Sequence, residues 1–162
     1  MTPLDHPPSR AVKLLGRLPL RLYDLHLGRL LGHRFLVLTH RGRRSGRTYR
    51  TMLEVVRWSP ARREAIVAAG WGEHASWYQN VCAAPAEDIL IANERFVPEQ
   101  RFLDLGERIE VLRAYKQEHP LATRALGGLL GVGVNDDLQL AAIRLPMIAF
   151  QPRTQVPHTH TG

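Results

Sequence analysis

The stretch Arg41–Arg50, which reads RGRRSGRTYR, decides the fold and points most directly to a function. It holds five arginines, two glycines and no acidic residue, and apolar runs stand on both sides of it, Phe35–Leu38 before and Met52–Val56 after. Two apolar runs joined by a glycine-containing polar turn predict a pair of antiparallel strands. Arginines crowded into one turn repel one another, so the cluster indicates a ligand whose phosphate or carboxylate oxygens match guanidinium groups. A solvated basic hairpin is the alternative interpretation.

The overall charge favours the same kind of partner. The 162-residue chain carries a formal net charge of +7, and between Arg34 and Arg63 there are nine arginines against one acid, Glu54. Such an excess is typical of proteins that bind nucleic acid, acidic lipid or a small anionic molecule. One cysteine, Cys82, excludes an intrachain disulfide and favours a reducing compartment. Its place in an apolar helical pattern predicts a buried structural thiol.

The chain divides into three parts by composition. Residues 1–33 hold a proline-rich arm and then leucines at helical spacing among arginines, which predicts a basic amphipathic helix. That helix either caps the core or lies on a membrane surface. Residues 34–153 form the expected folded domain, and residues 154–162 are expected to be a disordered tail. No apolar run approaches the roughly 20 residues of a membrane span, and no secretory signal is visible, so we expect a cytoplasmic protein with possible membrane association.

The pattern of the middle part predicts an α+β fold. Strands are expected at Arg34–Thr39, Tyr49–Arg57, Glu64–Ala69, Ile89–Ala92, Arg95–Leu103 and Ala142–Gln151. Helices are expected at Ser76–Ala84, Glu107–His119 and Leu121–Leu130. Ser76 and Gln79 have the spacing of a capping box at the start of the first of these helices. Asn93-Glu94 reads as a two-residue turn, and Pro146 places the last strand at an edge or a bulge. Strands and helices do not alternate regularly, which favours a mostly antiparallel small barrel with peripheral helices.

A second feature lies after the third strand. Val67–Gly72 ends in small residues and glycines and leads into Ser76–Asn80, which includes Trp77 and Tyr78. Backbone without bulky side chains suits a flat ring, although tryptophan and tyrosine at such positions are more often core residues. The sequence contains no zinc-ligand spacing, P-loop or nucleophile motif, and we assign no metal and no catalytic residue.

Together, in this order and spacing, the two features resemble the deazaflavin-dependent nitroreductase family. The resemblance runs from about Phe35 to Phe150 and is most specific at Gly42–Gly46. Members are small split β-barrel proteins that use coenzyme F420, so it implies that fold and that cofactor. The phosphate and acidic tail of the cofactor would be held by Arg43, Arg44, Ser45, Gly46 and Arg50. The deazaflavin ring would lie along Ala68, Ala69, Gly70, Trp71 and Gly72, with Trp77 and Asn80 at matching helix positions.

Departures from the family pattern concern the substrate more than the cofactor. Met52 stands where proline is common, and Arg50 lies one residue later than the arginine of many members. Gly70 replaces a serine placed near substrate in the nitroimidazole-activating members, and the loop after it is shorter. Their tyrosine-rich C-terminal segment has no counterpart around Leu121–Asp137.

The resemblance implies an F420H2-dependent oxidoreductase, expected as a homodimer, that transfers a hydride to a quinone, an enone or a nitroaromatic acceptor. Three alternatives stay open: an FMN-binding split-barrel protein, a non-catalytic F420 carrier and a basic nucleic-acid-binding module. FMN has a single phosphate and needs fewer arginines. Nucleic acid is the weaker alternative, because the basic residues are neither interleaved with aromatic residues nor placed on a recognition helix.

Overall fold

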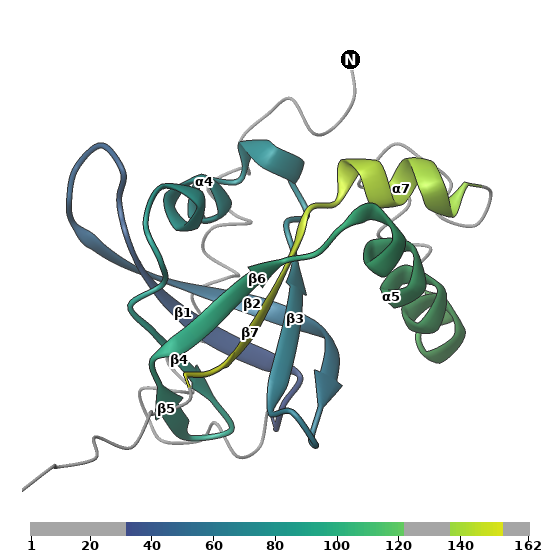
Figure 1. Ribbon diagram of the computed structural model, residues 1–162, viewed down its shortest axis with the longest axis horizontal. Helices are drawn as coiled ribbons and strands as arrows, with labels where there is room; N and C mark the ends of the chain where they lie inside the picture. Colours follow the sequence, from purple (N-terminus) through teal and green to yellow (C-terminus); the bar gives the residue numbers. More distant parts are fainter. Residues whose placement is uncertain (1–31, 122–136, 154–162) are drawn as a thin grey trace, which may run out of the picture.

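The computed structural model describes residues 32–121 and 137–153 (Figure 1). Its strands are β1 Phe35–Arg41, β2 Thr48–Ser59, β3 Glu64–Ala68, β4 Asp88–Ile91, β5 Glu94–Phe96, β6 Pro98–Phe102 and β7 Met147–Pro152. Its helices are the 3-10 helix η2 Gly72–His74 and the α-helices α4 Ser76–Ala83, α5 Leu105–Glu118 and α7 Leu138–Arg144.

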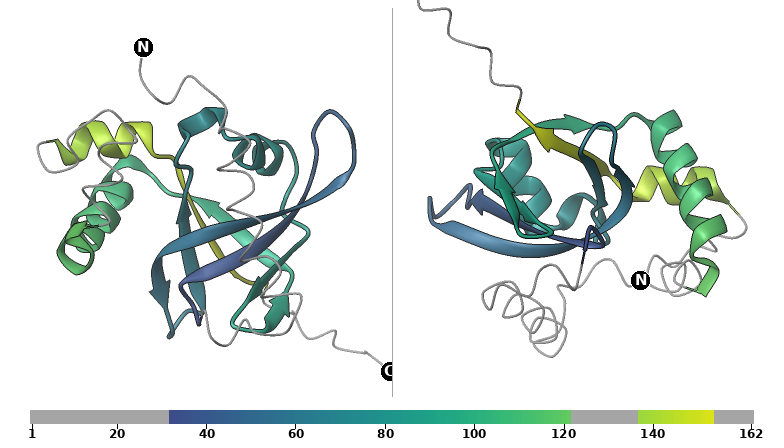
Figure 2. Two further views of the ribbon diagram at one scale, coloured as in Figure 1. Left: turned by 180° about the vertical axis from the view of Figure 1, so that it is seen from behind. Right: turned by 90° about the horizontal axis from the view of Figure 1, so that it is seen from below.

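The strands form one antiparallel sheet that curls into a nearly closed barrel. Its order is β5-β4-β1-β2-β3-β7-β6, and every neighbouring pair is antiparallel. The two end strands, β5 and β6, are consecutive in the chain and separated only by Val97. A sheet whose two edges are joined by one residue must curve back on itself, as Figure 2 shows in its right-hand view. The predicted α+β split barrel with peripheral helices is therefore confirmed.

Alternation along the strands builds two cores on opposite faces of the barrel wall. Val67 of β3 and Phe150 of β7 point into the barrel and are fully buried with Leu36 and Leu38 of β1. The intervening residues, such as Ile66 and Met147, pack outward against α5 and α7. Successive side chains of a strand point to opposite faces, so a wall with both faces buried needs apolar residues at every position. α5 and α7 lie side by side on that outer face (Figure 1).

The first three strands and α5 are confirmed to within about two residues, whereas the later turns differ. The hairpin β4–β5 turns at Ala92-Asn93, whose φ angles are 47° and 67°, and the predicted turn at Asn93-Glu94 is one residue off. Two residues with positive φ match the twist of the flanking strands. The predicted strand Arg95–Leu103 is divided at Val97, because the chain passes there from one edge of the sheet to the other.

The prediction for the last strand was wrong at its start and in its position. α7 covers part of the range expected as strand, and its Asp137 cap accepts a hydrogen bond from the Leu140 amide at 2.9 Å. Pro146 lies before β7 and not within it, and β7 sits between β3 and β6, away from any edge. The N–H that Pro146 lacks is therefore not needed for a hydrogen bond within the sheet.

Two predictions about α4 were also wrong. Its N-cap is Ala75, with no side-chain capping bond, whereas a complete capping box formed by Asp104 and Glu107 opens α5. Cys82 is exposed, because it lies on the outward face of a helix only eight residues long. The predicted N-terminal helix, the helix expected at Leu121–Leu130 and the C-terminal tail lie outside the described residues. Within residues 32–121 and 137–153, no helix is long and apolar enough to cross a bilayer.

Candidate functional site

The arginine turn, residues Gly42–Arg47, closes the hairpin of β1 and β2, which projects from the barrel at the upper left of Figure 1. The Gly42 amide donates to the Arg47 carbonyl and the Gly46 amide to the Gly42 carbonyl, both at 2.8 Å. Gly46 has φ of +66°, which favours glycine, and a Cβ at Gly42 would lie 2.6 Å from Ser45 Oγ. The two glycines therefore determine the shape of the turn.

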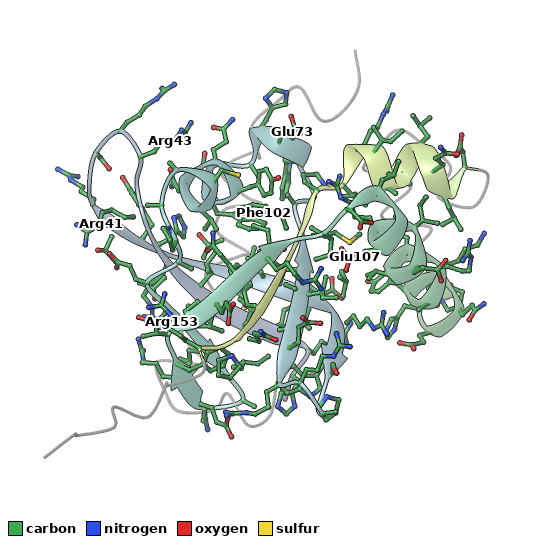
Figure 3. The ribbon with its side chains drawn as sticks, in the orientation of Figure 1. Arg41, Arg43, Glu73, Phe102, Glu107 and Arg153 are labelled. Carbon is green, nitrogen blue, oxygen red and sulfur yellow. The ribbon has the colours of Figure 1, made fainter. Side chains whose placement is uncertain are left out.

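The structure gives the arginines of this region different roles. Arg41 pairs with Glu87, with 2.6 Å between Nη2 and Oε1, and also donates to the Gly46 carbonyl. Arg43 points toward α4, where it bonds Asn80 and Gln79 (Figure 3). The side chains of Arg44 and Arg47 are exposed, and neither has a partner within the described part of the chain. Two guanidinium groups are therefore available to a ligand, while Arg41 and Arg43 shape the turn.

Beneath the turn lies a polar chain that links Arg43 and Asn80, both expected at the site, to His40 and Thr51, which the sequence analysis did not single out. Asn80 Oδ1 accepts from the backbone and side chain of Arg43, and Asn80 Nδ2 lies 3.2 Å from His40 Nδ1. His40 Nε2 lies 3.0 Å from Thr51 Oγ1. Burial lowers the pKa of His40, and the nearby Glu87 carboxylate opposes this in part. In the sequence, the sign of a buried polar group here was the polar pair Thr39-His40, which follows the apolar run of the first strand.

The second part of the site is the end of β3, residues Ala68–Gly72. Ala69 is fully buried, and its amide donates to the Pro146 carbonyl at 2.9 Å. Gly72 has φ of +62°, and a Cβ there would lie 3.2 Å from the carbonyl oxygen of Arg144. At Gly70 a Cβ would meet no atom within 4 Å. The amides of Gly70 and Trp71 have no hydrogen-bond partner among the described residues, so this backbone can accommodate and bond a ligand.

The aromatic residues near the β3 end are mainly structural. Trp77 is 8 % exposed and belongs to the barrel core, and Trp71 is half-buried against the same core. The ring of Tyr78 meets Trp77 edge-on at 5.9 Å and Phe102 at 6.2 Å. Burial, together with the neighbouring Cys82, raises the pKa of Tyr78. These rings fix α4 between the arginine turn and the β3 end.

The uncovered half of β2, residues 48–54, has no β3 partner among the described residues and connects the two parts. β2 pairs with β1 from Thr48 to Glu54, but its pairing with β3 begins only at Val55. At about 3.3 Å per residue, the seven steps from Thr48 to Val55 span roughly 23 Å. The structure therefore brings Arg43, Ser45, Gly46 and Asn80 together at one end and Ala68–Gly72 together at the other. An elongated ligand, anionic at one end and flat at the other, suits this arrangement.

Comparisons with known proteins identify the family and the fold of the chain. The sequence profile of the family described as F420H(2)-dependent quinone reductase matches residues 21–123, more than half of the chain. A solved structure described as F420-H2 dependent reductase (FDR-A) is 18 % identical, with a TM-score of 0.51, over 74 % of this chain and 96 % of that one. A structure described as a domain-swapped dimer has the same identity and TM-score, over 82 % of this chain and 99 % of that one.

The barrel is also shared with a flavin protein. A pyridoxamine 5'-phosphate oxidase-related, FMN binding protein from Nostoc punctiforme is 14 % identical, with a TM-score of 0.54, over 92 % of this chain and 82 % of that one. Similarities this distant show a common fold. No curated protein matches the sequence. The family profile confirms the resemblance drawn from the sequence: the chain belongs to the F420H2-dependent quinone reductase family and is an F420-dependent oxidoreductase.

Proposed function

We propose that this protein binds F420H2 between the arginine turn and the β3 end and uses it to reduce a quinone. The observation that carries the proposal is that the guanidinium groups of Arg44 and Arg47, which have no partner among residues 32–121 and 137–153, occur together with an open, side-chain-free backbone at Gly70. Family membership supplies the cofactor and favours a quinone among the three acceptor classes considered.

The chemistry of the arginine turn fits the anionic tail of the cofactor. Arg44 and Arg47 would bind its phosphate and carboxylate oxygens, and a hydrogen bond to a charged group contributes about 1.5–3 kcal/mol. Ser45 offers a hydroxyl, although its Oγ already lies 3.1 Å from the Tyr49 hydroxyl. Arg43 and Asn80, which bond each other, would support the turn from beneath. Arg50 is exposed on the same strand and extends the cationic surface along β2.

The β3 end fits a flat heterocycle. Gly70 leaves room for the ring, and the amides of Gly70 and Trp71 would donate to its polar edge, whereas Ala68 packs against the outer core. When bound, F420H2 supplies a hydride, and the protein contributes orientation and a site protected from water. Trp71, which is half-buried against the inner core, would shield one side of that site. No protein nucleophile is required for such a transfer, and we assign no catalytic residue.

FMN is the second candidate ligand, because the barrel is shared with an FMN binding protein. Fluorescence titration of the purified protein with F420, FMN and a short DNA duplex distinguishes the three candidate ligands. We expect F420 to bind at least tenfold more tightly than FMN, because a longer anionic tail engages more arginines. Tighter binding of FMN or of DNA would overturn the proposal.

Turnover is tested separately. Oxidation of F420H2 is followed by absorbance with menadione, cyclohexenone and a nitroaromatic compound as acceptors. We expect menadione to be reduced fastest. Tight F420 binding without turnover of any acceptor would favour a non-catalytic carrier.

Three broader proposals accompany this function. Residues 34–153 would form the cofactor-binding domain. The protein would be a homodimer, and light scattering after size-exclusion chromatography measures its mass in solution.

The basic N-terminal segment would contact anionic membrane, where each nearby cation contributes about 1 kcal/mol to the free energy of binding. Co-sedimentation with anionic vesicles, comparing the full chain with a truncated protein that starts at Arg34, tests this. Equal sedimentation of the two proteins would argue for a cap over the core.

A further inference from the structure

The hydrogen-bonded chain Thr51–His40–Asn80–Arg43, in which His40 and Asn80 are buried, has one consistent arrangement of its hydrogen atoms. The backbone N and Nη1 of Arg43 lie 3.1 Å and 3.0 Å from Asn80 Oδ1, and both are donors, so the Asn80 oxygen must face Arg43. The Asn80 amide nitrogen then faces His40 and donates to Nδ1. His40 must therefore be neutral, with its proton on Nε2 directed at Thr51 Oγ1.

A second proton on His40 cannot be accommodated in this arrangement. Protonated Nδ1 is a donor and would face the NH2 group of Asn80, which also donates. Turning the Asn80 amide over would offer oxygen to His40, but it would direct NH2 at the two donors of Arg43. Either orientation leaves donors facing each other in a buried place, because Asn80 is 6 % exposed and His40 3 %. The bonds lost are those between Asn80 and Arg43, which leaves the bond from Arg43 to Gln79 as the remaining side-chain link between the turn and α4.

Resting on the proposed function, we propose that neutral His40, acting through Asn80, is the positioning residue for the arginine turn, and that protonation of His40 releases the turn and weakens F420 binding. His40 does not touch the ligand in this scheme. It keeps Asn80 in the orientation that holds Arg43, and thereby keeps Arg44 and Arg47 over the uncovered half of β2.

The groups around His40 set the pH at which release occurs. The Tyr49 ring of β2 stacks on the His40 ring, with 6.0 Å between the ring centroids. The Glu87 carboxylate before β4 favours the protonated form, but Arg41 and Thr48 bond the same carboxylate. The Arg43 guanidinium lies beyond Asn80 and disfavours added positive charge. The effect of burial exceeds that of Glu87, so the pKa of His40 lies below its usual value. The bonds from His40 through Asn80 to Arg43, which we call the clamp, therefore hold the turn at neutral pH and release it in acid.

The first experiment uses the full-length protein without cofactor. Nuclear magnetic resonance follows the His40 ring and the Arg43 backbone amide between about pH 5 and pH 8, where histidines titrate. We expect the Arg43 amide to shift in step with the His40 ring, and not with the surface His74. An Arg43 amide that stays unchanged while His40 titrates would overturn the clamp. Because no F420 is present, this result is independent of the proposed cofactor.

The second experiment measures F420 affinity against pH in three proteins. His40→Asn keeps a side-chain oxygen to accept from Asn80 but cannot titrate, so its affinity should not fall in acid relative to its value at neutral pH. Asn80→Asp offers carboxylate oxygens to both Arg43 and a protonated His40, so it should hold the turn in acid. Wild-type affinity, divided at each pH by that of His40→Asn to remove titration of the ligand, should fall roughly tenfold below the His40 pKa.

Melting temperatures of all three proteins report on folding. A purely structural role for His40 predicts that affinity follows melting temperature in every variant, and this would overturn the proposal. A wild-type pH profile identical to that of His40→Asn would overturn it as well. Failure of all three proteins to bind F420, with the Arg43 amide still coupled to His40, would refute the proposed function and leave the clamp in place.

Discussion

The arginine turn and the β3 end lie at the two ends of the proposed site and are built in opposite ways. The turn is exposed, cationic and held by its own backbone bonds, and it makes no contribution to either core. The β3 end is neutral and part of the barrel wall, where Ala69 is bonded to the Pro146 carbonyl and Gly72 packs against the carbonyl of Arg144. We infer that charge at the turn can be changed without loss of stability, whereas changes at the packed positions of the β3 end, such as Ala69 and Gly72, disturb folding as well as binding.

The largest expected effect is at Trp77, which supports α4 between the two regions. Trp77→Ala should lower the free energy of unfolding by about 3–5 kcal/mol, because it leaves a cavity in the barrel core. Trp77→Phe, the matched control, should lose less and keep F420 affinity. Chemical denaturation measures the stability. Unchanged stability with lost F420 binding would mean that Trp77 contacts the ligand directly.

A pair of glycines tests the β3 end itself. Gly72→Ala should lower the free energy of unfolding by about 1–2 kcal/mol, because alanine is unfavourable at positive φ and its Cβ would approach the Arg144 carbonyl. Gly70→Ala, two residues away in open space, should leave stability within about 0.5 kcal/mol. If Gly70 underlies the ring, this second variant should still weaken F420 binding. Identical effects of the two substitutions on stability and binding would contradict the comparison.

At the arginine turn the expectation is reversed. Arg44→Ala should weaken F420 binding by roughly tenfold, through loss of a charge-assisted hydrogen bond, with unchanged unfolding. Arg62→Ala removes an exposed arginine from the β2–β3 turn at the other end of β2 and is the matched control. Fluorescence titration gives the affinities. Equal affinity of wild type, Arg44→Ala and the double variant that also carries Arg47→Ala would identify the turn as a solvated basic hairpin.

Salt should produce the smallest effect and distinguish the two regions further. Raising the ionic strength screens exposed charges, so wild-type affinity for F420 should fall, and the dependence should be shallower in Arg44→Ala. Gly70→Ala should retain the full wild-type salt dependence, because it alters shape and leaves charge unchanged. Equal slopes in all three proteins would place the salt effect outside the turn.

Sequence reasoning was most successful where the signal is local. The alternation and turn residues around Arg41–Arg50 predicted β1 and β2, and the helical spacing of Glu107–His119 predicted α5. It was least successful where tertiary contacts decide. Residues 138–144 form a helix because Ala141 and Ala142 are buried against α5, although their apolar run reads equally well as strand. The burial of Cys82 was predicted wrongly, because neighbouring residues of one helical turn face opposite sides and tertiary contacts decide which side meets the core.

For the candidate site, the order and spacing of the motifs were sufficient for the cofactor family but not for the roles of individual arginines. Five arginines in ten residues are chemically alike in the sequence. Glu87 binds Arg41 from 46 residues away, and Asn80 binds Arg43 from 37 residues away. Arg44 and Arg47 are left without a partner in the described part of the chain. Separations of that length carry no local pattern, so no periodicity or motif could reveal them.

The sequence by itself determined the cationic turn, the glycines that shape it, the antiparallel sheet and the F420 family, because each depends on residues close together in the chain. Only the tertiary structure decided which arginines are available, that Trp77 belongs to the core, and that His40 is buried beneath the turn. The physical reason is that burial and hydrogen-bond partners depend on which strand edges meet when the sheet closes. That closure brings α4 and the segment before β4 against the end of β1, where the polar chain beneath the arginine turn assembles.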